Sequence, residues 1–107
     1  MNQVFRALAD PTRREILRIL RQGPLSAGAI ADRFPQRRST LSAHFNVLKA
    51  ANLVETERQG QTIRYALNLS VFEETMAALM ATFGIGDEAT VPAAANTNNK
   101  AEQGEAP

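Results

Sequence analysis

Three helix-breaking points divide the first half of this chain into short segments. They are Asp10-Pro11, Gly23-Pro24 and Pro35. Each favours the end or the start of a helix, because proline lacks an amide N–H and restricts the residue before it. Apolar residues recur at helical spacing between these points. The pattern predicts four short helices, over residues 2–9, about 11–21, 27–34 and about 38–51.

Several of the expected helix starts carry capping residues. Asp10 is a good N-cap, and Pro11 fits the first helical position, where its missing N–H would have no partner. Ser26 is expected to cap the third helix. Ser70 is expected to cap a last helix, which carries apolar residues as far as Phe83.

A period of two replaces the helical spacing after residue 52. The run 62–67 alternates apolar and polar side chains, and a loop containing Gly60 separates it from the run 53–58. Two such runs joined by a glycine-containing loop predict a β-hairpin. Four helices, a hairpin and a final helix are typical of a winged helix-turn-helix, which is mainly α with a small β-hairpin.

Charge divides the chain into two parts. Residues 1–86 hold eleven Lys/Arg and seven Asp/Glu, a balance of +4, whereas residues 87–107 hold one Lys and four acids, a balance of −3. We expect residues 1–86 to form one folded domain and residues 87–107, which are poor in large apolar side chains, to be a disordered acidic tail. The chain contains no cysteine, signal peptide or membrane-length apolar run, so a cytoplasmic protein without stable membrane association is expected.

The fourth predicted helix has two unlike faces. Leu41, Phe45 and Leu48 share one narrow face that should meet the core. The opposite face is small and polar with positive charge around it, which suits a helix inserted in a DNA major groove about 12 Å wide. The side chains expected to read base edges are Arg38, Ser39, Ser42, Ala43 and Asn46. The alternative is an amphipathic helix whose outer face is only solvated.

The predicted hairpin tip offers a second polar surface. Residues 58–61 place one cation and two amides at a flexible turn, and Arg64 lies on the outward side of the next strand. Cations on such a wing can reach DNA phosphates. The alternative is a turn that is polar only because exposed turns are polar.

No arrangement of residues indicates catalysis. His44 is the only histidine, and we expect it to be half-buried and hydrogen-bonded, since one histidine without cysteine cannot form a zinc site. Glu73 and Glu74 are adjacent on a helix and diverge by about 100°. A glycine-rich phosphate loop and an activated nucleophile are also lacking. We therefore expect no enzyme activity, no metal site and no cofactor.

The first and last helices carry more apolar residues than one small core requires. Surplus apolar surface on terminal helices predicts a partner, most simply a second copy in a two-fold dimer. The residues expected at this interface are Val4, Phe5, Leu8, Phe72, Met76, Leu79, Met80 and Phe83. The alternative is that the two helices pack on each other within one chain.

Three ordered motifs resemble the ArsR/SmtB family of repressors. They are residues 8–17 (LADPTRREIL), residues 41–48 (LSAHFNVL) followed by 51–54 (ANLV), and residues 58–61 (RQGQ) followed by Tyr65. The match covers about residues 3–83. The resemblance implies a homodimeric winged-helix repressor that dimerises through its first and last helices and binds an imperfect palindrome.

The chain also departs from the family pattern. Its third helix lacks the cysteine pair that arsenic, cadmium or lead sensors often carry, and its last helix lacks the Asp and His ligands of many zinc and nickel sensors. The chain therefore resembles the metal-site-free, autorepressor branch. The resemblance leaves three signals open: a sequestering membrane protein, a small metabolite as unknown effector, or the repressor's own concentration. Arg37 replaces the usual small capping residue of the recognition helix, which weakens the cap and adds a cation.

We therefore expect a sequence-specific transcriptional repressor that binds double-stranded DNA as a homodimer through a single domain, residues 1–86. The residues expected to hold the wing and phosphates are Ser26, Arg37, Thr40, Lys49, Arg58, Gln59, Gly60, Gln61 and Arg64. The alternative is a winged-helix protein–protein assembly module with incidental DNA binding. That alternative calls for large aromatic or aliphatic anchors on the outward face of the fourth helix, which carries none.

Overall fold

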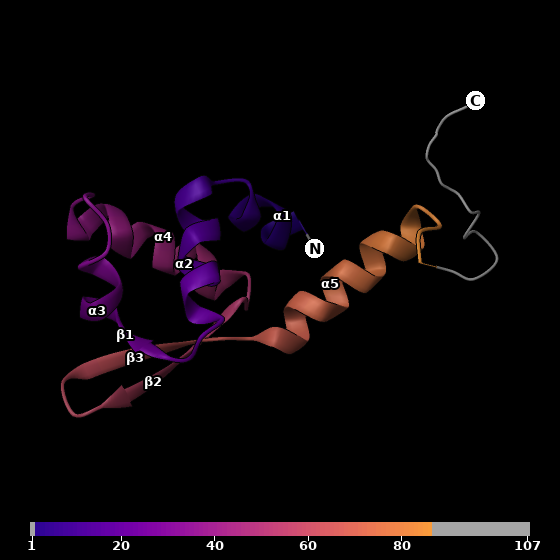
Figure 1. Cartoon of the computed structure of the whole chain (residues 1–107). Coiled ribbons are helices and arrows are strands. Elements are labelled where there is room, and N and C mark those ends of the chain that lie inside the picture. Colours follow the sequence, from indigo (N-terminus) through magenta and orange to yellow (C-terminus); the bar gives the residue numbers. More distant parts are fainter. Residues whose placement is uncertain (1, 87–107) are drawn as a thin grey trace. The chain divides into compact units, whose positions relative to one another are not determined.

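The structure is a computed structural model that describes residues 2–86 (Figure 1). The described chain forms two compact units, which divide between Glu73 and Glu74. The predicted disordered tail, residues 87–107, lies outside the described residues.

The first unit contains the four predicted N-terminal helices. They are α1 (Asn2–Leu8), α2 (Pro11–Leu20), α3 (Ala27–Ala31) and α4 (Arg38–Ala50). Only α3 is clearly shorter than the predicted 27–34. The backbone tightens after it, since Arg33 N–H donates to the Ile30 carbonyl and Phe34 N–H to the Ala31 carbonyl at 3.0 and 3.1 Å. These bonds span three residues and are typical of a helix that is ending.

Local side-chain caps fix two of the helix starts as predicted. The Asp10 carboxylate accepts the Arg13 backbone N–H at 3.1 Å, and Ser26 Oγ accepts the Ala29 N–H at 3.1 Å. The prediction for Ser70 was wrong. A helix capped by Ser70 would begin at Val71, whereas the last helix, α5 (Leu69–Thr82), begins two residues earlier. Ser70 therefore lies inside its first turn instead of before it.

The hairpin forms as predicted, from β2 (Val54–Gln59) and β3 (Thr62–Leu67). A third strand, β1 (Leu25–Ser26), was not predicted, because two residues carry no readable periodicity. It pairs antiparallel with β3, and the sheet order is β1-β3-β2. Gly60 at the hairpin tip has φ +63°, and a Cβ there would meet no heavy atom within 4 Å, so the tip is an open turn that favours glycine.

A short buried joint connects α4 to the hairpin. Asn52 has φ 60°, and Leu53 N–H donates to the Leu48 carbonyl at 3.1 Å. This is the left-handed C-terminal turn that commonly ends a helix. Ala51 and Leu53, on either side of Asn52, are 4% and 0% exposed, so the packing on both sides fixes the direction in which the chain leaves α4.

The core of the first unit is formed by α1, α2, α3, α4 and the sheet. The rings of Phe45 on α4 and Tyr65 on β3 stack with centroids 4.6 Å apart, so α4 is packed directly on the hairpin. Val4, which we expected at a dimer surface, is only 6% exposed and belongs to this core. The surplus apolar surface of α1 is therefore smaller than the sequence indicated.

The second unit contains most of α5 and the turn that ends it. Gly84 has φ 69°, and Ile85 N–H donates to the Met80 carbonyl at 2.7 Å, the geometry of a glycine helix terminus. No helix among residues 2–86 has the length and apolar character needed to cross a membrane.

Candidate nucleic-acid interface

The two faces of α4 differ as predicted. Leu41, Phe45 and Leu48 are 1%, 5% and 0% exposed and form part of the core. The residues predicted to read base edges are all exposed: Arg38, Ser39, Ser42, Ala43 and Asn46. The exposed face carries only short or polar side chains, so α4 can approach another surface closely.

Three of these side chains line the same recess. Arg38, Ser42 and Asn46 border a hollow of about 240 Å³ between α3, α4 and β3. Ile63 of β3 lines the same hollow. Ser39 and Ala43 are exposed but do not line it. The structure thus brings the guanidinium, hydroxyl and amide groups together on the side of α4 that faces the hairpin.

The start of α4 has no side-chain cap. Arg37 is the N-cap residue, with extended backbone and no capping hydrogen bond from its side chain. The first N–H groups of a helix have no partner within the helix and carry partial positive charge. Together with the exposed Arg37, they offer hydrogen-bond donors and a cation to an anion such as a phosphate.

Arg38 is held only loosely. Its guanidinium lies 3.5 Å from the Asp32 carboxylate, and both side chains are largely exposed, at 71% and 76%. Exposed ion pairs contribute about 1 kcal/mol or less. Arg38 can therefore exchange this partner for another acceptor at little cost.

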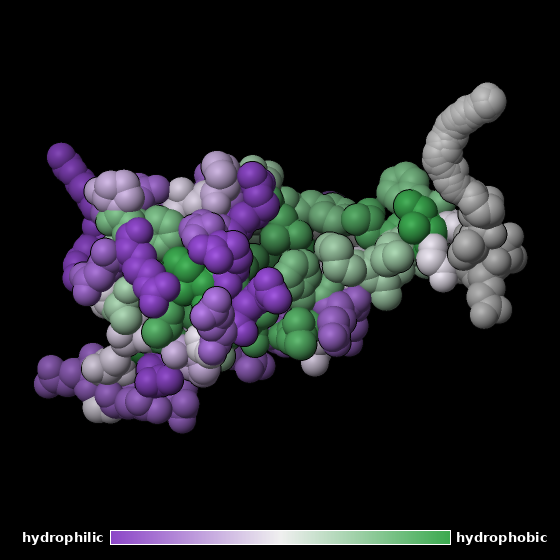
Figure 2. All heavy atoms as spheres, in the orientation of Figure 1, coloured by the Kyte–Doolittle hydropathy of each residue, from purple (hydrophilic) through white to green (hydrophobic). Residues whose placement is uncertain are grey.

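The two arginines of the hairpin lie on opposite faces. Arg58 is in register with Ile63, whereas Arg64 is in register with Glu57, and neighbouring side chains along a strand alternate between faces. Arg64 also donates to the Pro24 carbonyl at 3.2 Å. No ion pair of Arg58 occurs within residues 2–86. Figure 2 shows hydrophilic residues over the hairpin tip, where Gln59, Gly60 and Gln61 are exposed.

The remaining predicted phosphate contacts are spread along the same elements. Thr40 and Lys49 are exposed on α4, and Ser26 is half-buried at the start of α3. The hydroxyl oxygen of Ser26 accepts the Ala29 N–H as a cap, which leaves its O–H proton free to donate to an anion.

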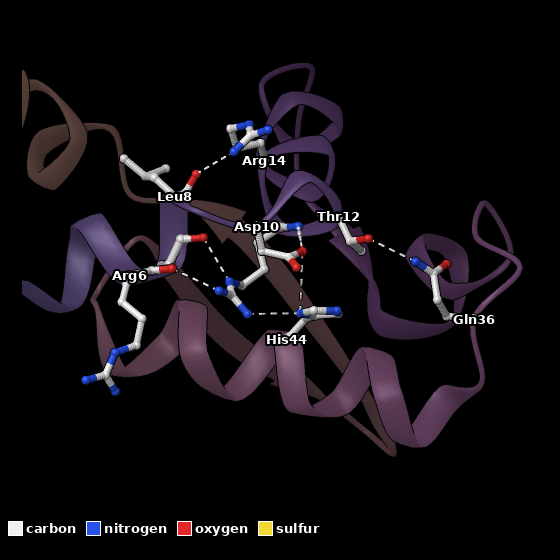
Figure 3. A network of polar contacts seen from close by, with 9 residues as sticks. Arg6, Leu8, Asp10, Thr12, Arg14, Gln36 and His44 are labelled. Carbon is white, nitrogen blue, oxygen red and sulfur yellow. Dashed lines mark hydrogen bonds and ion pairs between the residues drawn. The ribbon is translucent and has the colours of Figure 1, made fainter.

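Behind α4 lies a polar network that sequence reasoning did not find (Figure 3). His44 is 14% exposed, which confirms that it is half-buried, and its Nδ1 lies 3.2 Å from the Arg13 guanidinium. Gln36 donates to Thr12 Oγ1 at 2.9 Å. The first contact joins residues that are 31 positions apart in the sequence, and the second joins residues that are 24 positions apart. Local sequence patterns cannot predict contacts over such separations.

Asp10 belongs to this network, and the pKa of its carboxyl is lowered. Burial raises the pKa of its carboxyl, but the hydrogen bond from the Arg13 backbone N–H and the charge that His44 carries when its ring is protonated outweigh burial, so the pKa is lower than usual. The carboxylate form is therefore the one that the fold stabilises.

The residues predicted at a dimer surface differ in exposure. Phe5 on α1 is 37% exposed, and Met80 and Phe83 in the second unit are 41% and 69% exposed. Leu8, Phe72, Met76 and Leu79 are half-buried. Leu69 and Ile85 are also exposed, at 54% and 58%, and were not predicted because they lie before and after the apolar run, Val71 to Phe83, that was assigned to the last helix.

Among the described residues, no group of three or more His, Asp or Glu side chains is arranged to hold a metal ion. The candidate site is a polar protein surface built from α4, the start of α3 and the hairpin. Its chemistry consists of the amides of Asn46, Gln59 and Gln61, together with hydroxyl groups and cations, around a helix face with short side chains.

Known proteins share this architecture. A family model for a helix-turn-helix domain matches residues 8–57. The chain is 40% identical over 87 residues to the transcriptional repressor SdpR of Bacillus subtilis, covering 81% of this chain and 97% of SdpR. It is 36% identical over 78 residues to the nodulation protein NolR of Rhizobium meliloti, covering 73% and 64% of the two chains. A solved ArsR family transcriptional regulator superposes with a TM-score of 0.71 and 30% identity, covering 78% of this chain and 86% of the other.

Proposed function

Since the chain belongs to the ArsR/SmtB family of winged helix-turn-helix repressors, which are DNA-binding transcriptional regulators, we propose that α4 reads the major groove of its operator. Arg38, Ser42 and Asn46 make the central base contacts, with Ser39 and Ala43 beside them. Arginine suits guanine edges, asparagine suits adenine edges, and alanine suits the thymine methyl group.

One observation carries this proposal: the contrast between the two faces of α4. The face with Leu41 and Phe45 is buried, whereas the face with Arg38, Ser42 and Asn46 is exposed, short and polar. A helix that docked on another protein would instead present large apolar anchors on its exposed face.

Phosphate contacts would surround the reading face. Arg37 and the N–H groups of the first turn of α4 bind one phosphate, and Arg58 on the hairpin binds another. Thr40, Lys49 and the start of α3 at Ser26 add contacts along the backbone. Such contacts fix the position of the protein but carry little sequence information.

We further propose that two copies bind an imperfect palindrome in the cytoplasm. Phe5 on α1, Met80 on α5 and Phe83 just after α5 are exposed apolar residues that support a two-fold interface. A DNA site with two-fold symmetry matches a dimer with the same symmetry. Release from DNA would follow from an effector or a sequestering protein that weakens this dimer or covers α4.

Asn46→Ala tests the base contact. We expect the variant to bind the operator about 10-fold more weakly, within the roughly 1–3 kcal/mol of one base contact, and to bind random DNA as before. Quantitative gel shifts on both DNAs provide the measurement. Gln22→Ala, at an exposed amide outside the interface, is the matched control. An equal loss on both DNAs would contradict base reading by Asn46.

Arg58→Ala tests the wing, with Arg64→Ala as its counterpart on the other face of the hairpin. Arg58→Ala should weaken binding to all sequences and reduce the slope of log affinity against log salt by about one unit. Arg64→Ala should change the slope less, because its guanidinium is already bonded to the Pro24 carbonyl. Unchanged affinity and slope in Arg58→Ala would remove the wing from the interface.

A further inference from the structure

On the side of α4 that faces away from the candidate interface, one arginine links the helix to the end of α1 through polar contacts. Arg13 Nε donates to the Ala7 carbonyl at 2.8 Å, and a terminal nitrogen donates to the Arg6 carbonyl at 2.9 Å. The other terminal nitrogen lies 3.2 Å from His44 Nδ1. We name this set of contacts the Arg13 bridge.

We infer that Arg13 is a positioning residue for DNA reading, which sets the orientation of α4 relative to α1 through His44. The inference rests on the proposal that α4 is the reading helix. It assigns a role in specificity to a residue that contacts no DNA.

At its α1 end, the Arg13 bridge fixes the angle of the helix as well as its distance. The last carbonyls of a helix have no intrahelical partner, and Arg13 binds two of them with two nitrogens of one planar guanidinium. A planar group with two bonds fixes both the distance and the angle of the segment that it binds. The end of α1 is thereby fixed relative to the first turn of α2.

At its α4 end the bridge uses a single acceptor. A guanidinium can only donate, so His44 Nδ1 must accept, and the ring is then neutral with its proton on Nε2. Asp10 lies 3.9 Å from the same nitrogen, too far for a hydrogen bond. Arg13 is therefore the hydrogen-bonding partner of His44 in this network.

A second contact from the same helix turn supports the assignment. Thr12 accepts a hydrogen bond from Gln36, which lies in the turn just before α4. Two adjacent residues of α2, Thr12 and Arg13, thus hold α4 near its start and near its middle. These two polar contacts add to the core packing of Leu41, Phe45 and Leu48 in resisting rotation of α4 about its own axis.

Rotation is the motion that matters for reading. His44 lies two residues from both Ser42 and Asn46 on the same helix, so a turn of α4 that lengthens the contact with Arg13 also displaces these two side chains. Base contacts require a donor–acceptor distance of about 3 Å with good alignment. Small rotations should therefore reduce specific binding while leaving phosphate contacts, which are less directional, largely intact.

Arg14 provides a matched control within the same turn. It donates to the Leu8 carbonyl at 2.8 Å, so it also ties the α1–α2 connection, but it makes no hydrogen bond to α4 in the described chain. Arg13→Met and Arg14→Met each remove one such arginine. Only Arg13→Met breaks the link to His44.

The first experiment measures the affinity of both variants for operator and random DNA, together with thermal unfolding. Arg13→Met should lower operator affinity about tenfold, the order of one weakened base contact, with little change on random DNA. Arg14→Met should leave the ratio of the two affinities unchanged. Equal ratios in the two variants, or an equal loss on both DNAs in Arg13→Met, would overturn the inference.

Variants of His44 test the same contact from its other side if Arg13→Met does not fold. His44→Gln retains an acceptor for Arg13 and should preserve most of the specificity, whereas His44→Phe removes the acceptor and should match Arg13→Met. The double variant Arg13→Met/His44→Phe should lose no more specificity than either single variant, since both remove the same contact. Additive losses, or identical behaviour of Gln and Phe, would contradict the bridge.

A measurement without DNA separates the bridge from the proposed function. His44 is the only histidine, so its two ring nitrogens give an unambiguous nitrogen-15 spectrum. The folded protein near neutral pH should show an unprotonated Nδ1 that accepts a hydrogen bond, and the Nδ1 signal should shift in Arg13→Met but not in Arg14→Met. An unchanged signal would overturn the bridge, whereas unchanged operator binding in Asn46→Ala would overturn base reading alone.

Discussion

Two helices of this protein, α2 and α4, begin in opposite ways. The start of α2 is closed by its own sequence: the Asp10 carboxylate caps the Arg13 N–H, and Pro11 occupies the first helical position. The start of α4 follows Arg37, whose side chain makes no capping bond. The closed start lies inside the polar network behind α4, and the open start lies at the edge of the candidate interface.

The two helix starts differ in whether their N–H groups are bonded within the protein or are left for a ligand. A side-chain cap satisfies helix N–H groups within the protein and contributes to folding. A helix start without a cap leaves these groups to solvent or to a ligand, and a neighbouring cation favours an anionic one. We interpret α2 as the helix that fixes the framework and α4 as the helix whose start is completed by DNA.

The largest effect on this comparison is expected from Asp10→Ala. Loss of the cap should reduce the free energy of unfolding by about 1 kcal/mol, which lowers Tm by roughly 4–8 °C in a domain of this size. Thermal unfolding followed by circular dichroism provides the measurement. Arg37→Ala is the counterpart at the other helix and should leave Tm nearly unchanged. Equal losses in the two variants would show that the two starts do not differ.

Arg37→Ser sharpens the comparison, because stability and binding should move in opposite directions. The serine hydroxyl can cap α4 and should raise the free energy of unfolding by about 0.5–1 kcal/mol. Removal of the cation should weaken binding to all DNA and reduce the salt slope by about one unit. Arg33→Ser, at an exposed arginine in the turn between α3 and α4, removes a charge without adding a cap and should give no gain in stability.

The smallest expected effect is on the pH dependence of the free energy of unfolding. The pKa of Asp10 is lowered in the folded protein from its usual value of 3.8. Its stabilising contribution is therefore complete above the unfolded pKa and is lost as the pH falls through the folded pKa. Asp10→Asn retains an N-cap without a titratable charge. The difference in urea stability between wild type and Asp10→Asn should shrink between pH 6 and pH 3, and a constant difference would contradict the assignment.

Local signals in the sequence predicted much of the fold. Asp10, Pro11 and Ser26 marked helix starts correctly because capping is decided within three residues. The buried face with Leu41 and Phe45 followed from periodicity alone. Ser70 failed because a serine near a helix start is compatible with more than one position in the first turn.

Long-range packing accounts for what was missed. Strand β1 exists because Leu25 lies opposite Tyr65, forty residues away. Val4 is buried because α1 packs within the core, whereas the sequence showed only that it is apolar. The base-reading residues could be proposed from the exposed pattern of α4, but Arg13 could not be linked to His44, because that contact depends on how three helices are brought together.

The joint at Asn52 and the hairpin tip at Gly60 also determine where this protein can tolerate a change in length. An inserted residue at the joint would displace Ala51 or Leu53 from the core and break the bond between Leu53 and Leu48. At the tip, the backbone around Gly60 is exposed and has open space beside it, and such turns accept insertions readily. Descendants of this protein can therefore acquire longer or shorter hairpins, while the step from α4 to the hairpin keeps a constant number of residues.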